Sequence, residues 1–393
     1  MAQQHLDPTN STNSTVVPAD AVAGYLRAQA TEFLRALRTH RETGGGAAAG
    51  AEESAYAALA LRRSARRISG TLHTFRPLLD TDWSESLRPE LAWLSGSLGR
   101  EHAYAARLNR LVTALNRLSG ATPFPTQPPI PTRPTTTSAT TGRSTTAAST
   151  AGARPADAAS TAGSRSVDAT STAGGRSPAA VPTPDRGNLT VGAAKAGALL
   201  DRQLTLARTR AHSAALQALG SSRFHAVADS LAVLASEVPL TPTAPTADLR
   251  PLAAAAHDRL RDAVTGLPLH MAGHPYNAEA LIHGLSPDTA PHPQDAPWHQ
   301  VRLLLRLHRY ALEVLYPEAV PVDVRLLAAG EALNRHRDAS EAASAAASAA
   351  RTPRITPATA YALGVLHADQ RHEVEASRFA FQQSWQKEAV STS

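Results

Sequence analysis

Hydrophobic residues recur at helical spacing along most of the chain. After Asp20, apolar residues lie three and four positions apart, and the run ends in the basic residues that favour a helix C-terminus. No segment shows the alternation of apolar and polar residues that is typical of a strand, so we predict an all-α fold. The expected helices span residues 20–41, 53–76, 82–94, 99–118, 190–219, 222–237, 247–267, 298–315, 322–350 and 357–386.

The segment 120–188 differs from the rest of the chain. It consists of Thr, Ser, Ala, Pro and Gly with scattered Arg and has almost no large apolar residue. Such a composition buries too little surface to offset its ordering entropy, so we predict a disordered linker, a solubilising spacer rather than a polyanion tether. The linker separates a first helical half, 20–119, from a second, 189–388, and we expect the two halves to form one composite domain.

Composition excludes several classes of protein. The 393 residues include no cysteine, which rules out a disulfide scaffold, a Cys-ligated metal centre and a thiol nucleophile. No apolar run approaches the ~20 residues of a membrane span. The polar N-terminus lacks the regions of a signal peptide. We therefore expect a cytoplasmic protein without a membrane partner.

Positive charge is carried almost entirely by arginine. Of the 39 Lys and Arg residues, only Lys195 and Lys387 are lysines. The planar guanidinium suits bidentate contact with phosphate. The formal net charge of +6 is modest for this length, so the placement of the arginines has to indicate the partner.

The stretch from Trp298 to Tyr316 carries the most informative pattern. At about 100° per residue, four of its basic residues fall within an arc of roughly 80°, and apolar residues cover most of the remaining circumference. Unpaired buried charge is expensive, so we expect this row to face carboxylates, solvent or an anionic ligand. Few acids lie nearby in sequence, which favours a water-filled groove lined with arginine. The four basic residues are His299, Arg302, Arg306 and Arg309.

A second basic row occupies the predicted helix 53–76. Arg62 and Arg66 share one face of it, with Arg63 and Arg67 alongside, while apolar residues fill the opposite side. One such row alone is usually a solvated face with snorkelling arginines. Two matched rows in two halves of the chain favour a shared function and suggest internal duplication. Each row is followed by a motif that we interpret as a turn, at residues 98–102 and 333–338.

These motifs resemble the CHAD domain, the conserved histidine α-helical domain. The second-half signature, His-x-x-Arg-x-x-x-Arg-x-x-Arg-Tyr, is matched from His299 to Tyr310, with Glu313 in its usual place. The first-half signature is matched by Arg62, Arg66 and Arg67 and by the run from Phe75 to Leu78. The resemblance extends from about residue 20 to residue 386, interrupted by the linker.

The first half departs from the family pattern. Leu59 stands at the histidine position, and Ala103 and Ala105 replace the two acids of the Leu-Gly-x-x-Arg-Asp-x-Asp motif. These changes bear on whether the first half contributes residues to a binding site. They do not affect the residues of the second half.

The resemblance implies two antiparallel helical bundles related by a pseudo-two-fold axis, with a basic central groove that binds inorganic polyphosphate. We expect no cofactor and no enzymatic activity, and association with polyphosphate granules fits the resemblance. Protonation of His299 and His336 on contact with phosphate would strengthen binding as the pH falls toward 6. The candidate polyphosphate-binding residues are Arg62, Arg66, Arg67, His299, Arg302, Arg306, Arg309 and His336.

Other functions remain open. An enzyme of polyphosphate metabolism is disfavoured because we expect neither a P-loop nor a Glu-x-Glu pair to hold metal. Scarce aromatic residues make nucleic-acid binding at most weak and nonspecific. A partly degenerate scaffold without a ligand is a further alternative. Five histidines are expected in loops or caps rather than on a metal: His257, His270, His274, His283 and His292.

Overall fold

The structure is a computed structural model that describes residues 17–43, 48–120, 186–273, 293–317 and 323–386. The chain divides into two units, one formed by residues 1–122 and 186–393 and the other by residues 123–185. The larger unit contains both predicted helical halves. The linker prediction falls almost wholly outside the described residues, although helix α4 already begins at Arg186.

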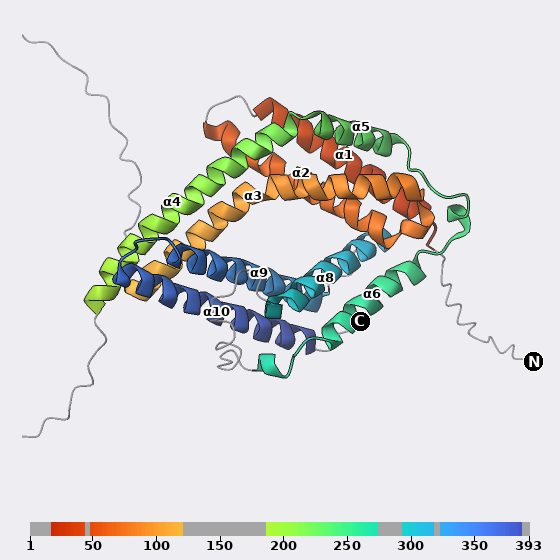
Figure 1. The fold of residues 1–393 in the computed structure, drawn as a ribbon. Coiled ribbons are helices and arrows are strands. Elements are labelled where there is room, and N and C mark those ends of the chain that lie inside the picture. The colour runs from red at the N-terminus through yellow and green to blue at the C-terminus, as the bar shows by residue number, and fades with distance from the viewer. Residues whose placement is uncertain (1–16, 44–47, 121–185, 274–292, 318–322, 387–393) are drawn as a thin grey trace, which may run out of the picture. The chain divides into compact units, whose positions relative to one another are not determined.

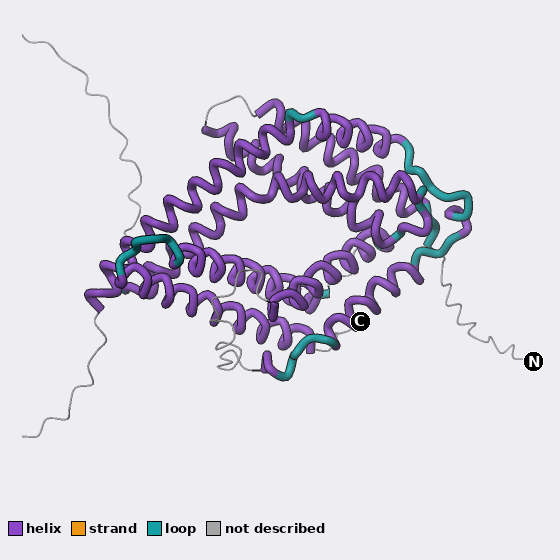
Figure 2. The backbone as a smooth tube through the Cα atoms, in the orientation of Figure 1, coloured by secondary structure: helices purple, strands orange, loops and turns teal. Residues whose placement is uncertain are grey.

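The described residues form helices and no strand, which confirms the all-α prediction (Figure 2). One isolated bridge joins Leu79 to Leu240. The α-helices are α1 (Asp20–Thr43), α2 (Ala48–Thr74), α3 (Thr81–Ser119), α4 (Arg186–Leu219), α5 (Ser222–Ser236), α6 (Arg250–Thr265), α8 (Ala296–Leu315), α9 (Val324–Ala350) and α10 (Pro357–Gln386). Short 3-10 turns are η1 (Arg76–Leu78), η2 (Ala244–Thr246), η3 (Met271–Gly273) and η4 (Pro293–Asp295).

Helix α3 corrects the prediction of two helices between residues 82 and 118. Its N-terminus is capped by Asp80, whose side chain accepts a hydrogen bond from the Trp83 amide at 2.8 Å. The helix ends at Ser119, and the next residue, Gly120, is its C-cap in the left-handed conformation. Helical structure continues through Gly99 because apolar residues on both sides of it stay buried at helical spacing. These include Leu87, Leu91, Leu94, Leu98, Leu111 and Leu115.

The helices pack so that residues from both predicted halves share the same cores. Helix α1 lies against α2 and α5, the long helices α3 and α4 run side by side, and α9 packs along α10 (Figure 1). One apolar cluster joins α1, α2 and α5 with Ala311 and Val314 of α8. Another joins the end of α3 to α4, α9 and α10. Residues of both halves therefore contribute to the same apolar clusters.

No helix in the described segments is long and apolar enough to cross a membrane.

Candidate functional site: an arginine-lined pocket

Helix α8 carries its arginines on a face that adjoins its buried apolar residues. Trp298, Val301 and Leu305 are at most 2% exposed and pack in an apolar cluster with α6, α9 and α10. Arg302 and Arg306 are half-buried, whereas Arg309 is exposed. The three arginines of the predicted row thus lie on a helix whose buried apolar side chains are packed in the core.

Helix α2 brings the second arginine row against the first. Its apolar face is fully buried, which fixes the direction in which its basic face points. At Gly70 an added Cβ would lie 2.6 Å from the Tyr310 ring and 3.2 Å from Leu307, so the two helices approach closely only because no side chain stands there. This crossing places two rows that lie about 240 residues apart in sequence beside each other.

Together the rows line a pocket of about 360 Å³, which we call the arginine pocket. Helices α2, α8 and α9 contribute to its wall. Eight arginines line it, together with a single acidic residue, Glu313. The lining residues are Leu59, Arg62, Arg63, Arg66, Arg67, Arg302, Arg306, Arg309, Tyr310, Glu313, Asn334 and Arg337.

The charges in the arginine pocket repel one another. Burial, followed by the charges of Arg62 and Arg306, lowers the pKa of Arg66 to about 9. Burial and the charges of Arg306 and Arg337 lower the pKa of Arg302 to about 10. Among the described residues, neither side chain has an ion-pair partner, and the buried Nε atoms of Arg62 and Arg302 have no hydrogen-bond partner. An anion entering this pocket would relieve the repulsion and satisfy these donors.

Arg67 differs from its neighbours because it is neutralised internally. Its Nε donates to Glu313 at 2.7 Å, and Tyr25 donates a second 2.7 Å hydrogen bond to the same carboxylate. Burial lowers the pKa of Arg67, but the hydrogen bond and charge of Glu313 outweigh it, and the net shift is upward. This contact ties α1, α2 and α8 together, so Arg67 also has a structural role.

The motifs at residues 98–102 and 333–338 lie inside helices α3 and α9, which corrects their interpretation as turns. Gly99 does not form a turn, and its role is to leave space for a neighbouring side chain. A Cβ added to it would lie 2.5 Å from the guanidinium carbon of Arg62, so the glycine gives that side chain its space. In the second motif, Asn334 and Arg337 project into the arginine pocket.

Replacing Gly99 by alanine is expected to keep the fold and weaken anion binding several-fold. Alanine favours a helix interior by roughly 0.5–1 kcal/mol over glycine, but its methyl group would displace the flexible end of Arg62. Gly24→Ala is the matched control, since nothing lies within 4 Å of a Cβ on that exposed position of α1. Thermal unfolding and a binding titration on both variants measure the two effects. Equal affinity in the two variants would contradict the assigned role of Gly99.

The structure separates His299 from the arginine pocket. This half-buried side chain lines a neighbouring pocket of about 560 Å³ with Arg107 and Glu341. Glu341 pairs with both Arg107 and Arg337, and therefore links this second pocket to the arginine pocket. The sequence-based set also omitted Arg63 and Arg337. Arg63 stood next to a selected residue, and Arg337 lay within the predicted helix 322–350 but in a motif that was interpreted as a turn.

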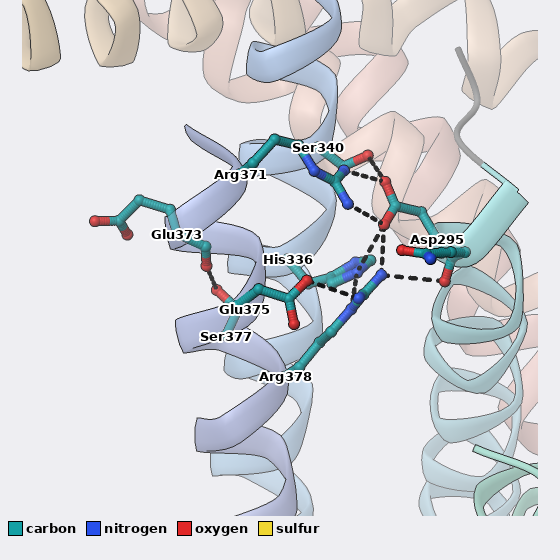
Figure 3. A network of polar contacts seen from close by, with 9 residues as sticks. Asp295, His336, Ser340, Arg371, Glu373, Glu375, Ser377 and Arg378 are labelled. Atoms are coloured by element: carbon teal, nitrogen blue, oxygen red, sulfur yellow. Dashed lines mark hydrogen bonds and ion pairs between the residues drawn. The ribbon is translucent and has the colours of Figure 1, made fainter. Parts of the chain in front are cut away.

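His336 is not placed to contact phosphate. It is 1% exposed and stacks on Trp298 with ring centroids 5.7 Å apart. It belongs to a buried polar network around Asp295, which pairs with Arg371 at 2.8 Å and Arg378 at 2.6 Å (Figure 3). A side chain enclosed in this way is a structural element of the α8–α9–α10 junction, so the structure does not support its assignment to the binding set.

Within this network, His336 does not become protonated near pH 6, contrary to the expectation from the sequence. Burial lowers its pKa to about 4, and the neighbouring Asp295 only partly compensates. Burial likewise lowers the pKa of His299. The pKa of Asp295 is well below its usual range, because the hydrogen bonds and charges of its partners outweigh the effect of burial. The expectation that His336 gains charge as the pH falls toward 6 is therefore wrong.

From the burial of His336 we predict instead that the stability of the protein depends on pH. The unfolded chain protonates this histidine near pH 6.5, whereas the folded protein resists protonation down to pH 4, so the unfolded state binds more protons between these values. The free energy of unfolding should fall by about 3 kcal/mol from this group as the pH drops from 6.5 to 4. Urea unfolding of His336→Gln across this range should show a shallower slope. A slope identical to that of the unmodified protein would refute the attribution to His336.

One pair of glutamates on α10 has the spacing of a metal-binding motif. Glu373 and Glu375 have the Glu-x-Glu spacing, so the prediction that the chain lacks such a pair is wrong. Glu375 is buried and pairs with Arg378 at 2.7 Å, whereas Glu373 lies near Arg110 at 3.6 Å. The two carboxylates thus serve different partners. Nowhere in the described segments do three His, Cys, Asp or Glu side chains gather in a way that could hold a metal ion.

The histidines expected in loops or caps have mixed outcomes. His257 lies inside α6, which corrects its placement in a loop. His270 occupies a turn, as expected. The other three, His274, His283 and His292, lie outside the described residues.

Comparison with known proteins places the chain in a family. The family model described as the CHAD domain matches residues 28–347. The chain belongs to the CHAD domain family. This confirms the resemblance inferred from the two arginine rows, and the matched span includes every lining residue of the arginine pocket.

A solved structure similar to this CHAD protein is "PptA from Streptomyces chartreusis". The two chains are 62% identical, with a TM-score of 0.69, and the match covers 94% of this chain and 99% of that one. No curated protein sequence matches closely enough to count as a relative.

Proposed function

We propose that this protein binds inorganic polyphosphate in the arginine pocket without turning it over. One observation carries the proposal: eight arginines and one carboxylate line a pocket of about 360 Å³. Structural arginines are normally paired, but Arg62, Arg302 and Arg306 have no acidic partner among the described residues, and burial together with mutual repulsion lowers the pKa of each. Such an arrangement persists at a cost to stability that a bound polyanion would offset.

The spacing of the arginines fits a phosphate chain. Residues one turn apart on a helix are separated by roughly 5–6 Å along its axis, so Arg302 and Arg306 can reach successive phosphates. A third pocket, of about 390 Å³, shares Arg66, Arg306 and Tyr310 with the arginine pocket and adds His73 and Arg88. The arginine pocket and this third pocket together would offer a continuous basic path longer than a single phosphate requires.

The first half contributes to this site despite its departures from the family pattern. Leu59, which stands at the missing histidine position, lines the arginine pocket. Four arginines of α2 line the same pocket. This observation speaks against a scaffold that has lost its ligand. A pseudo-two-fold relation between the halves, with the groove along it, is part of the same proposal.

A salt titration distinguishes polyphosphate from nucleic acid. Each arginine–phosphate contact releases counterions, so with four or more contacts the logarithm of the association constant should fall with the logarithm of salt concentration at a slope of about −3 or steeper. Defined-length polyphosphate should displace double-stranded DNA, while orthophosphate at equal phosphorus concentration should not. Preferential or sequence-specific binding of DNA would overturn the proposal. Release of phosphate from polyphosphate by the purified protein with magnesium would show instead that it is an enzyme.

Association with polyphosphate granules follows from this function. A fluorescent fusion should co-localise with granules, and the fusion carrying glutamate at the α8 arginines should not.

A further inference from the structure

A different pocket lies on the other side of α8, and the proposed function does not use it. His308 points about 140° away from the centre of the arginine row, at 100° per residue. It lines a pocket of about 490 Å³, here called the α6–α8 pocket. This volume is within the range of small-molecule sites and far exceeds that of one water molecule. The lining residues are His257, Arg261, Thr265, His308, Asp323, Arg325, Leu326 and Trp385.

His308 is the feature that indicates a ligand. It is only 8% exposed, and its Nδ1 atom is buried without a hydrogen-bond partner in the described structure. Buried polar atoms in proteins almost always have a partner, so an orphan that lines a cavity marks a place where a ligand or ordered water belongs. The ring of His257 lies beside it, with centroids 4.9 Å apart.

The charged residues around His308 favour an anion. His257 and Arg261 are four residues apart on α6 and therefore line one face of that helix. Asp323 is already engaged: it accepts the Arg325 amide at 2.9 Å as the N-cap of α9, and it pairs with the Arg325 guanidinium at 2.9 Å. Arg261 has no ion pair within the described chain. The lining thus has a net positive charge and donors without a matching acceptor.

A metal ion fits the same residues poorly. Two imidazoles are present, but the described residues contain no group of three potential ligands, and Arg261 and Arg325 would repel a cation. Burial, together with the neighbouring His257, lowers the pKa of His308 to about 4. The ring is therefore neutral at pH 7 and can donate one hydrogen bond to an oxyanion.

We propose that the α6–α8 pocket binds a small molecule that carries a phosphate or carboxylate group. The oxyanion would lie between His308 and Arg261. Leu326 and Trp385 would contact the apolar part of the molecule. This site is separate from the arginine pocket and does not depend on what the arginine pocket binds.

The test uses the full chain with Arg302→Gln and Arg306→Gln, which weakens the arginine pocket. Inorganic phosphate, glycerol 3-phosphate and succinate are titrated at pH 7, followed by calorimetry and by tryptophan fluorescence, to which Trp385 contributes. At least one probe should bind saturably. Phosphate binding without succinate binding would assign the oxyanion to phosphate, and the reverse would assign it to carboxylate.

Variants locate the binding. Arg261→Gln and His308→Gln should each weaken it about tenfold, as expected for a lost hydrogen bond to a charged group. Arg259→Gln is the matched control, because this exposed arginine is on α6 but does not line the pocket. Arg261 is exposed, so its variant remains informative if His308→Gln misfolds. Absence of saturable binding for all probes, or equal affinity in the Arg261 and Arg259 variants, would overturn the proposal.

Discussion

Replacement of Arg302, Arg306 and Arg309 by glutamate is expected to reduce polyphosphate affinity by a factor of about 10³ or more. Hydrogen bonds to charged groups contribute about 1.5–3 kcal/mol each, and 1.4 kcal/mol corresponds to a factor of ten. Three such contacts would be lost, and the new carboxylates would repel phosphate. Fluorescence anisotropy with labelled polyphosphate measures the change.

The same variant should remain folded. Glutamates on α8 would face Arg62 and Arg66, and would relieve the repulsion that lowers their pKa values. The matched control replaces three exposed arginines outside every described pocket, Arg27, Arg202 and Arg210, and changes the net charge equally. That control should lose less than tenfold in affinity. If both variants lose affinity equally, the general field of the protein rather than the arginine pocket would be responsible.

Replacement of Asp295 by alanine is expected to destabilise the protein by about 3–5 kcal/mol. Its carboxylate is fully buried and pairs with Arg371 and Arg378, which are also buried. Removing one partner of a buried ion pair leaves an uncompensated charge, and here two guanidinium groups would be left. Asp295 immediately precedes α8, so its loss should also loosen the helix that carries the arginine row (Figure 3). Urea unfolding measures the free energy change.

An exposed ion pair provides the control for Asp295. Glu42 pairs with Arg38 at 2.7 Å on the surface of α1, and both side chains are more than half exposed. Glu42→Gln should change stability by less than about 1 kcal/mol. A small effect for Asp295→Ala as well would mean that Arg371 and Arg378 find other partners or water, and that the network in Figure 3 is not a main support of α8.

Local patterns were sufficient for most of the helices, although not for the continuity of α3, and for most of the arginine pocket. Arg302, Arg306 and Arg309 could be selected because the apolar residues between them identify the buried face of α8. Arg337 was not selected, because its motif was interpreted as a turn although the predicted helix 322–350 spans it. His336 was misassigned for a different reason. Its sequence neighbours are charged, while its actual partners, Asp295 and Arg378, come from other elements.

The sequence by itself determined that the protein is helical, that arginine carries its positive charge and that two helices bear matched basic rows. These properties depend on residue type and on the 3.6-residue repeat, both of which are local. Only the tertiary structure decided which charges are neutralised, which histidines are buried and which rows line one pocket. Those outcomes depend on contacts between residues far apart in the chain, such as Arg67 with Glu313 and Gly70 with Tyr310, where distance and desolvation set the energy of each group.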